Sequence, residues 1–311
     1  MPRRTPKRIS KIHSMIRRWY NAHRRELRWR ETRDPYEILV SEVMLQQTQV
    51  SRVQEKLPKF LKSFPTIGRL ARASGGEVIR AWEGMGYNNR ALRLRETAVI
   101  AARQYGGRIP NDVDQLGALP GIGPYTAHAL ACFAFGKRVP VVDVNIHRVL
   151  SRLFHRMPDA LSVRPVKEIW SLAASVLPKD AYIWNQALMD LGSAICVARK
   201  PVCHSCPIRE VCASNHLELS RTKVSGARAR AAEPMYAGLP RRLWRGKIVQ
   251  TLRALPNRTS ISIGQLGTAV KENFRTIDER WLTDVVGQLA NDGLVTSKRR
   301  SGKTFVSLTE R

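Results

Sequence analysis

Hydrophobic residues recur at helical spacing along most of the chain. The first such stretch, "SKIHSMIRRWYNAH", places Ile12, Ile16, Trp19 and Tyr20 on one face, as an amphipathic helix does. From residue 35 to about residue 191, similar patterns alternate with short breaks rich in Gly and Pro, such as "FPTIG", "YGGRIPND" and "LPGIGP". No alternating strand pattern interrupts them, so the sequence predicts an all-α region.

The pattern changes after residue 213. Residues 214–240 show no periodicity and are rich in Ala, Gly and Arg, which predicts a linker. Residues 241–311 then contain three helical patterns, a short strand before the second helix, and two final strands joined by the basic turn "SKRRSGK". This order resembles a winged-helix (α/β) domain. The third helix and the hairpin of such domains meet DNA in some proteins, whereas many winged helices bind only protein.

Composition points to a polyanionic partner. The 311 residues are 43% hydrophobic, which allows a proper core, and the formal net charge is +28. Such an excess favours nucleic acid as the partner, and a merely soluble basic protein is the alternative. Residues 1–11 are expected to form a loose basic arm. Because no apolar run reaches a membrane-spanning length and no signal core is present, we expect a cytoplasmic, nucleoid-associated monomer with no membrane contact.

Four of the five cysteines form a tight group. Cys196, Cys203, Cys206 and Cys212 have the spacing C-x6-C-x2-C-x5-C. In a reducing compartment such a group argues for metal binding rather than disulfides. Four thiolates suit either a tetrahedral zinc ion or a [4Fe–4S] cluster, and the spacing alone leaves both open.

A glycine pair separates two helical patterns in "ALPGIGPYTAHALACFAFG". Gly121 and Gly123 allow a tight turn whose backbone N–H groups, together with the following helix N-terminus, would hold a DNA phosphate. The alternative is an ordinary connection between two helices.

Two carboxylates lie in apolar stretches. Glu42 belongs to "SEVMLQQTQV", and Asp143 lies between two valines in "VPVVDVNIHRVL". A buried unpaired charge is costly, so each acid needs a reason for its place. Taken singly, Glu42 reads as a glutamate on the polar edge of a helix. Asp143 reads as the N-cap of a helix that starts near Asn145.

Taken together, these motifs resemble the helix-hairpin-helix (HhH-GPD) DNA glycosylase superfamily with an iron–sulfur loop. The resemblance covers residues 12–213 and rests on "SEVMLQQTQV", "LPGIGPYTAHAL", "VVDVNIHRVL", "WNQALMDLGSAIC" and the cysteine spacing, in this order. It implies an all-α fold of two subdomains, a [4Fe–4S] cluster held by the loop at 196–212, and double-stranded DNA with a mispaired or damaged base as the partner.

Three branches of this superfamily compete. The endonuclease III branch carries a lysine where this chain has Tyr125, so no Schiff base can form and a monofunctional enzyme is expected. The string "LQQTQ" favours the adenine DNA glycosylase (MutY-type) branch, which acts on adenine opposite 8-oxoguanine or guanine. A G:T or G:U mismatch thymine/uracil glycosylase is the alternative. An iron–sulfur DNA-binding regulator is the non-enzyme alternative.

The resemblance also implies residue roles. Glu42 would protonate the leaving base and then activate water, Asp143 would stabilise the sugar cation, and Tyr125 and Asn145 would orient this pair. Gln46, Gln47 and Thr48 would fill the gap left by the flipped base, and Tyr87 would intercalate. The implied set of DNA and base contacts is Trp29, Arg30, Leu45, Gln46, Gln47, Thr48, Tyr87, Gly121 and Gly123.

The chain departs from the adenine branch in two places. Asn88 and Asn89 follow Tyr87, where that branch usually has a tyrosine–serine pair. Residues 241–311 do not resemble the Nudix-like domain that recognises 8-oxoguanine there. We therefore expect a reduced preference between the two opposing bases.

Overall fold

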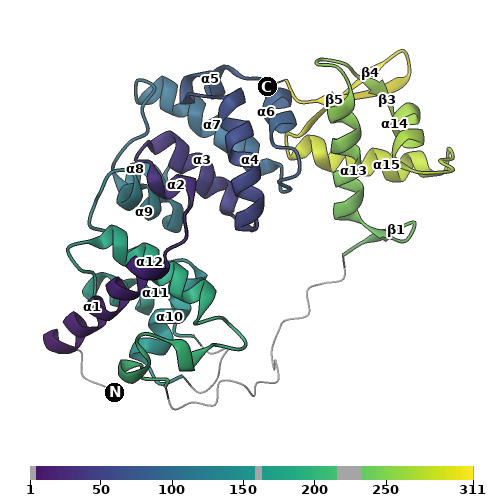
Figure 1. The fold of residues 1–311 in the computed structure, drawn as a ribbon. Coiled ribbons are helices and arrows are strands. Elements are labelled where there is room, and N and C mark those ends of the chain that lie inside the picture. The colour runs from purple at the N-terminus through teal and green to yellow at the C-terminus, as the bar shows by residue number, and fades with distance from the viewer. Residues whose placement is uncertain (1–4, 158–162, 216–232, 311) are drawn as a thin grey trace. The chain divides into compact units, whose positions relative to one another are not determined.

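The computed structural model describes residues 5–157, 163–215 and 233–310. Within these residues the chain is mainly helical, and every strand lies after residue 234. The chain folds into two compact units, each made of several segments (Figure 1). Of the described residues, the first unit holds 5–38, 111–117, 122–157 and 163–215, and the second holds 39–110, 118–121 and 233–310.

The first unit is a helical bundle with a cysteine loop at its C-terminal end. Its elements are α1 (Pro6–His23), α2 (Arg28–Glu31), α8 (Val113–Gly117), α9 (Pro124–Phe133), α10 (Val144–Phe154), α11 (Val166–Ser175), α12 (Ala181–Ala194), η1 (Cys203–Ser205) and η2 (Arg209–Val211). Helix α10 packs closely on α12, because Gly192 leaves room: a Cβ there would lie 2.7 Å from the Cβ of Asn145. This approach fixes the position of the α10 N-terminus.

Helix α1 begins earlier than expected. The structure places its start at Pro6, inside the residues predicted to form a loose basic arm. The side chain of Thr5 accepts a hydrogen bond from the backbone N–H of Arg8, and Pro6 occupies the first turn. A threonine cap followed by proline is a standard helix start, so the local chemistry outweighs the run of positive charge.

The second unit contains α4 (Val50–Ser63), α5 (Ile67–Arg72), α6 (Gly75–Ala81), α7 (Asn89–Gln104) and the part of α3 (Pro35–Leu45) that follows residue 38. Its helices bury large apolar side chains, including Phe60, Trp82 and Leu94. Two loops of this unit, one after α3 and one between α6 and α7, carry four of the nine expected DNA contacts: Gln46, Gln47, Thr48 and Tyr87.

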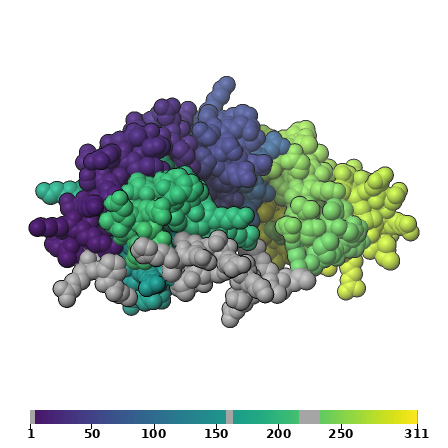
Figure 2. Space-filling model, turned by 60° about the horizontal axis from the view of Figure 1, so that its bottom comes forward, coloured from purple at the N-terminus to yellow at the C-terminus, as the bar shows by residue number. Residues whose placement is uncertain are grey.

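The C-terminal part of the second unit has the predicted order of elements. Helix α13 (Arg241–Ala254) precedes β3 (Ile261–Ser262), α14 (Ile263–Val270), α15 (Asp278–Asn291), β4 (Val295–Arg300) and β5 (Lys303–Leu308). The three strands form an antiparallel sheet in the order β3-β5-β4. In the space-filling view, the residues after about 240 form one solid body (Figure 2). Its apolar core includes Ile79 of α6, so this part packs on the helices of its own unit.

The predicted linker is only partly described. Residues 216–232 lie outside the described residues. The segment just before residue 241 forms a short hairpin of β1 (Met235–Tyr236) and β2 (Leu239–Pro240). The ring of Tyr236 stacks on Trp281 with centroids 3.9 Å apart, which attaches this hairpin to α15.

Candidate active site and cysteine loop

Asp143 caps α10, as the sequence predicts. One carboxylate oxygen accepts the backbone N–H of Ile146 at 2.6 Å, and the other accepts the side-chain amide of Asn145 at 2.9 Å. Burial raises the pKa of Asp143, whereas these hydrogen bonds act in the opposite direction. The carboxylate lines a pocket whose wall includes His147 and Trp170. Because Asp143 lines this pocket, its carboxylate can face a bound nucleoside and still cap the N-terminus of α10.

A polar chain leads from this cap to the cysteine loop. Arg148 donates to the side-chain oxygen of Asn145 at 2.9 Å and to the main-chain oxygen of Gly192 at 2.7 Å. Its Nε donates to the main-chain oxygen of Cys196 at 2.7 Å. The N-terminus of α10 and the first cysteine are therefore fixed by one guanidinium.

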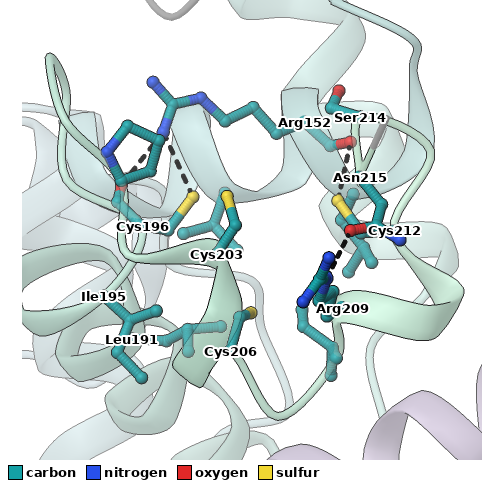
Figure 3. A pocket seen from close by; sticks show the side chains of 14 residues that line it. Arg152, Leu191, Ile195, Cys196, Cys203, Cys206, Arg209, Cys212, Ser214 and Asn215 are labelled. Atoms are coloured by element: carbon teal, nitrogen blue, oxygen red, sulfur yellow. Dashed lines mark hydrogen bonds between the residues drawn. The ribbon is translucent and has the colours of Figure 1, made fainter. Parts of the chain in front are cut away.

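The four clustered cysteines surround a single cavity (Figure 3). Its walls are mainly apolar, and no carboxylate is among the lining residues. Arg152, only 1% exposed, places Nη1 3.3 Å from the sulfur of Cys196. Arg152 also donates to the main-chain oxygens of Val197 and Ala198, at 2.8 Å each.

This donor set fits an iron–sulfur cluster. Burial raises the pKa of Cys206 to about 11 and that of Cys212 to about 12, so thiolates there need a cationic centre to balance their charge. Four soft donors around one apolar cavity suit a [4Fe–4S] cluster, which is held by four thiolates.

Glu42 lies in the second unit, in the last turns of α3. It is only 4% exposed, and its neighbours Val43 and Met44 are buried as well. The sequence correctly predicts an acid among apolar side chains at this place. Such burial favours the protonated form of a carboxylic acid, which is the form that can donate a proton to a leaving base. Because Asp143 belongs to the other unit, the convergence of the two acids stays a prediction.

The glycine hairpin has the expected backbone. Gly121 adopts a φ of +76°, and a Cβ there would lie 3.0 Å from the Cβ of Arg93. Helix α9 begins directly after Gly123, with Pro124 in its first turn. Tyr125 follows in that turn and is half-buried. The turn and the helix start have the expected backbone, and phosphate binding there and the orienting role of Tyr125 stay predictions.

Two expected DNA contacts adopt a backbone conformation that is rare for their residue types. Gln47, just after α3, has a φ of +55°, and Tyr87, between α6 and α7, has a φ of +45°. The ring of Tyr87 is 65% exposed. Left-handed residues other than glycine cost free energy and cluster at functional sites. Gln46, before Gln47, donates to the main-chain oxygen of Gly121 at 3.5 Å.

Arg90 connects these two loops, although no pattern in the sequence marks it for this role. Its side chain is 9% exposed and points from the first turn of α7 into the second unit. Its acceptors, at 2.5–3.2 Å, are the main-chain oxygens of Val43, Met44, Gln46, Met85 and Gly86 and the hydroxyl of Thr48. In a chain with so many arginines, nothing in the sequence distinguishes a buried one from a phosphate contact.

The structure places Trp29 and Arg30 inside the first unit. Trp29 is buried, and the guanidinium of Arg30 donates to both carboxylate oxygens of Asp190, at 2.7 and 2.9 Å. Neither side chain presents the exposed surface that direct base contact uses. Leu45 ends α3 and is half-buried. The roles of these three residues in DNA binding stay predictions.

Comparisons with known proteins agree with these features. Residues 40–170 match the family described as HhH-GPD superfamily base excision DNA repair protein. Residues 196–212, which hold all four clustered cysteines, match the iron–sulfur binding domain of endonuclease III. No described helix is both long enough and apolar enough to cross a bilayer.

Individual relatives come from all three expected branches. The chain is 40% identical to an adenine DNA glycosylase of Mycolicibacterium smegmatis over 287 residues, which cover 89% of this chain and 90% of that protein. The structure of a thermostable thymine-DNA glycosylase matches with a TM-score of 0.63 and 33% identity, over 67% of this chain and 97% of the other. A trapped endonuclease III–DNA covalent intermediate matches with a TM-score of 0.59 and 25% identity, over 68% and 97%.

Proposed function

We propose that this chain, which belongs to the HhH-GPD superfamily of base excision DNA repair proteins and to its adenine DNA glycosylase branch, removes adenine opposite 8-oxoguanine or guanine. Its substrate is DNA, and the bond it breaks is the N-glycosidic bond of a flipped base. It is monofunctional, because Tyr125 stands where a lysine would be needed to form a Schiff base.

One observation carries this proposal: the two acids have different environments. Glu42 is buried among apolar side chains, which favours its protonated form. Burial raises the pKa of Asp143 too, but this carboxylate accepts two hydrogen bonds and caps a helix, and both oppose that rise and favour its ionised form. In glycoside hydrolysis one carboxyl group donates the proton while the other stabilises the sugar cation. Glu42 has the first role and Asp143 the second, with Asn145 holding the second carboxylate.

Adenine is favoured over thymine or uracil by the relatives. The adenine glycosylase of M. smegmatis aligns over 89% of this chain, including much of the region after residue 213. The thymine-DNA glycosylase structure covers only 67%. Selectivity between 8-oxoguanine and guanine as the opposing base is proposed to be weak, because residues 241–311 do not resemble the Nudix-like domain usual in this branch.

We further propose that residues 241–311 form a winged helix that touches DNA through its hairpin. The exposed face of the third helix, α15, carries Glu279 and Asp284 and a single Arg280. The exposed residues of β4 and β5 include Lys298, Arg299, Arg300 and Lys303. Phosphates attract the hairpin and repel the acids. Replacing Arg299 and Arg300 with Ser should then make the salt dependence of DNA binding less steep, whereas an Arg280→Ser control should not.

The [4Fe–4S] cluster is bound by Cys196, Cys203, Cys206 and Cys212, and it supplies a cationic centre that orders residues 196–212. Residues 12–213 are proposed to act as the catalytic core, with residues 214–240 as a linker. A monomer associated with the nucleoid is the proposed state, given the charge of +28.

A panel of duplexes tests the function. Purified protein is incubated with duplexes containing A:8-oxoG, A:G, T:G and U:G, and alkali then cleaves each abasic strand. We expect cleavage at adenine in the first two duplexes. Glu42→Gln and Asp143→Asn should each lose at least about a hundredfold in rate.

Two outcomes would contradict this assignment. Cleavage confined to the T and U strands would assign the chain to the mismatch branch. Inactivity of the cluster-loaded parent protein on every duplex, with tight DNA binding retained, would favour the regulator.

A further inference from the structure

The six acceptors of Arg90 fall into two groups. Nη1 donates to the main-chain oxygens of Val43, Met44 and Gln46, at the end of α3. Val43 and Met44 lie in the last turn of α3, where carbonyls lack the N–H groups of a following helical turn, because the helix stops at residue 45. The guanidinium therefore also acts as a C-terminal cap for α3, the helix that holds Glu42.

The second terminal nitrogen of Arg90, Nη2, binds mainly the loop between α6 and α7. Nη2 donates to the main-chain oxygens of Met85 and Gly86 at 3.0 and 3.2 Å, directly before Tyr87. It also donates to the hydroxyl of Thr48 at 3.1 Å. One planar group thus joins the residues on either side of Gln47 to those just before Tyr87, although about 40 residues separate the two segments in sequence.

The chemistry of arginine suits this task. A guanidinium is rigid and presents donors in fixed directions, whereas the single nitrogen of lysine cannot reach both loops. Burial lowers the pKa of Arg90 to about 10, so the group is still charged at neutral pH. Its hydrogen bonds run to uncharged carbonyls and one hydroxyl, and such contacts fix geometry more than they add Coulomb energy.

We propose that Arg90 is a positioning residue that holds the Gln46–Thr48 loop and the Met85–Tyr87 loop as one rigid unit. It keeps Gln47 and Tyr87 in their left-handed conformations before DNA arrives, so that both side chains enter the duplex together as the base leaves the stack. This inference rests on the proposed glycosylase function. Arg90 itself touches neither the base nor the sugar.

Two substrates separate positioning from chemistry. The first is a duplex with adenine paired opposite 8-oxoguanine, from which the base must be extruded. The second places the same adenine opposite an abasic site, where no partner base resists extrusion. Single-turnover rates are measured on both, and 2-aminopurine beside the adenine reports unstacking by its fluorescence.

Arg90→Lys is compared with Arg95→Lys. Arg95 lies on the same helix, is partly buried and donates to the main-chain oxygen of Ala73, but it contacts neither loop. For Arg90→Lys we expect about a tenfold or greater loss on the paired substrate and a much smaller loss opposite the abasic site. The fluorescence rise should slow by the same factor. Arg95→Lys should change both rates equally and little.

The outcomes are distinguishable. Equal losses on the two substrates, or a loss matched by Arg95→Lys, would end the inference and leave the glycosylase assignment intact. A parent protein that excises neither adenine would overturn the proposed function instead. If Arg90→Lys unfolds, Thr48→Val removes the hydroxyl that accepts from Nη2 and donates to the main-chain oxygen of Gln46. It should shift the ratio of the two rates in the same direction by a smaller factor, whereas Thr48→Ser, which keeps the hydroxyl, should not.

Discussion

Arg90 and Arg152 are both buried arginines, but they hold their loops under different conditions. Each donates to several main-chain oxygens from loops distant in sequence. Beside Arg152, the loop is additionally tied by what the four cysteines bind. Each of the two loops joined by Arg90 contains one exposed residue, Gln47 or Tyr87, in an unfavourable left-handed backbone conformation. The cysteine loop can share its restraints with a cofactor, whereas the two loops proposed to enter DNA are joined to each other by the guanidinium of Arg90.

The largest expected effect is on the cysteine side of this comparison. Cys203→Ser removes one of four ligands, and since ligand binding is coupled to folding of the loop, the visible absorbance and the iron content should fall sharply and the Tm should drop. Cys132→Ser is the control, because Cys132 is buried far from the other four in sequence and belongs to no ligand set. A Cys203→Ser protein with full iron content would contradict the ligand assignment.

The next effect separates the two arginines directly. Arg152→Lys should release iron to a chelator about tenfold faster, because the fork that holds Val197, Ala198 and the sulfur of Cys196 is lost. Arg90→Lys should release iron at the parent rate while it slows extrusion of the base. If both variants lose iron equally fast, the two regions are not independent and the comparison fails.

A third effect concerns Asp143, the acid at the N-terminus of α10. Because burial raises the pKa of Asp143, the folded chain loses stability as the pH rises from the unfolded pKa to the folded pKa, and the penalty stays constant above that. Asparagine keeps the helix cap without the charge. Asp143→Asn should therefore have a higher Tm than the parent at pH 7, with the difference shrinking toward pH 4, although excision is lost.

Thermal unfolding between pH 4 and pH 8 measures this effect. Asp180→Asn is the matched control, because Asp180 also caps a helix of the first unit but is exposed. An Asp143→Asn protein that is less stable than its parent at pH 7 would show that the carboxylate helps to stabilise the fold there.

The smallest expected effect comes from the C-terminal region. Arg253 of α13 donates to the main-chain oxygen of Ile79 at 3.0 Å and to the side chain of Asn88, next to Tyr87, at 2.7 Å. Asn88→Ala removes one hydrogen bond worth about 1 kcal/mol. Excision from the paired duplex should fall about two- to fivefold, well short of the Arg90→Lys loss. A Gln250→Ala control removes a different contact between α13 and the helices, its bond to Glu83, and should leave that rate unchanged.

Short-range features could be predicted from the sequence because their chemistry is local. The cysteine spacing, the cap at Asp143, the glycine turn and the order of the last six elements each depend on residues close together in the chain. The prediction of a loose arm over residues 1–11 was wrong, although the signal for the start of α1 is also local. Thr5 and Pro6 mark this start within a run of basic residues. Taken singly, Glu42 was expected on the polar edge of a helix, and the structure buries it.

The sequence by itself therefore determined the family, and it predicted the cluster ligands and the two acids. Only the tertiary structure decided which arginines serve the fold. Most carbonyl groups that accept hydrogen bonds from Arg90 and Arg152 lie about 44 to 47 residues away in sequence, and folding brings them close. Every residue carries a carbonyl, so no side-chain pattern marks the acceptors, and folding alone brings them to one guanidinium.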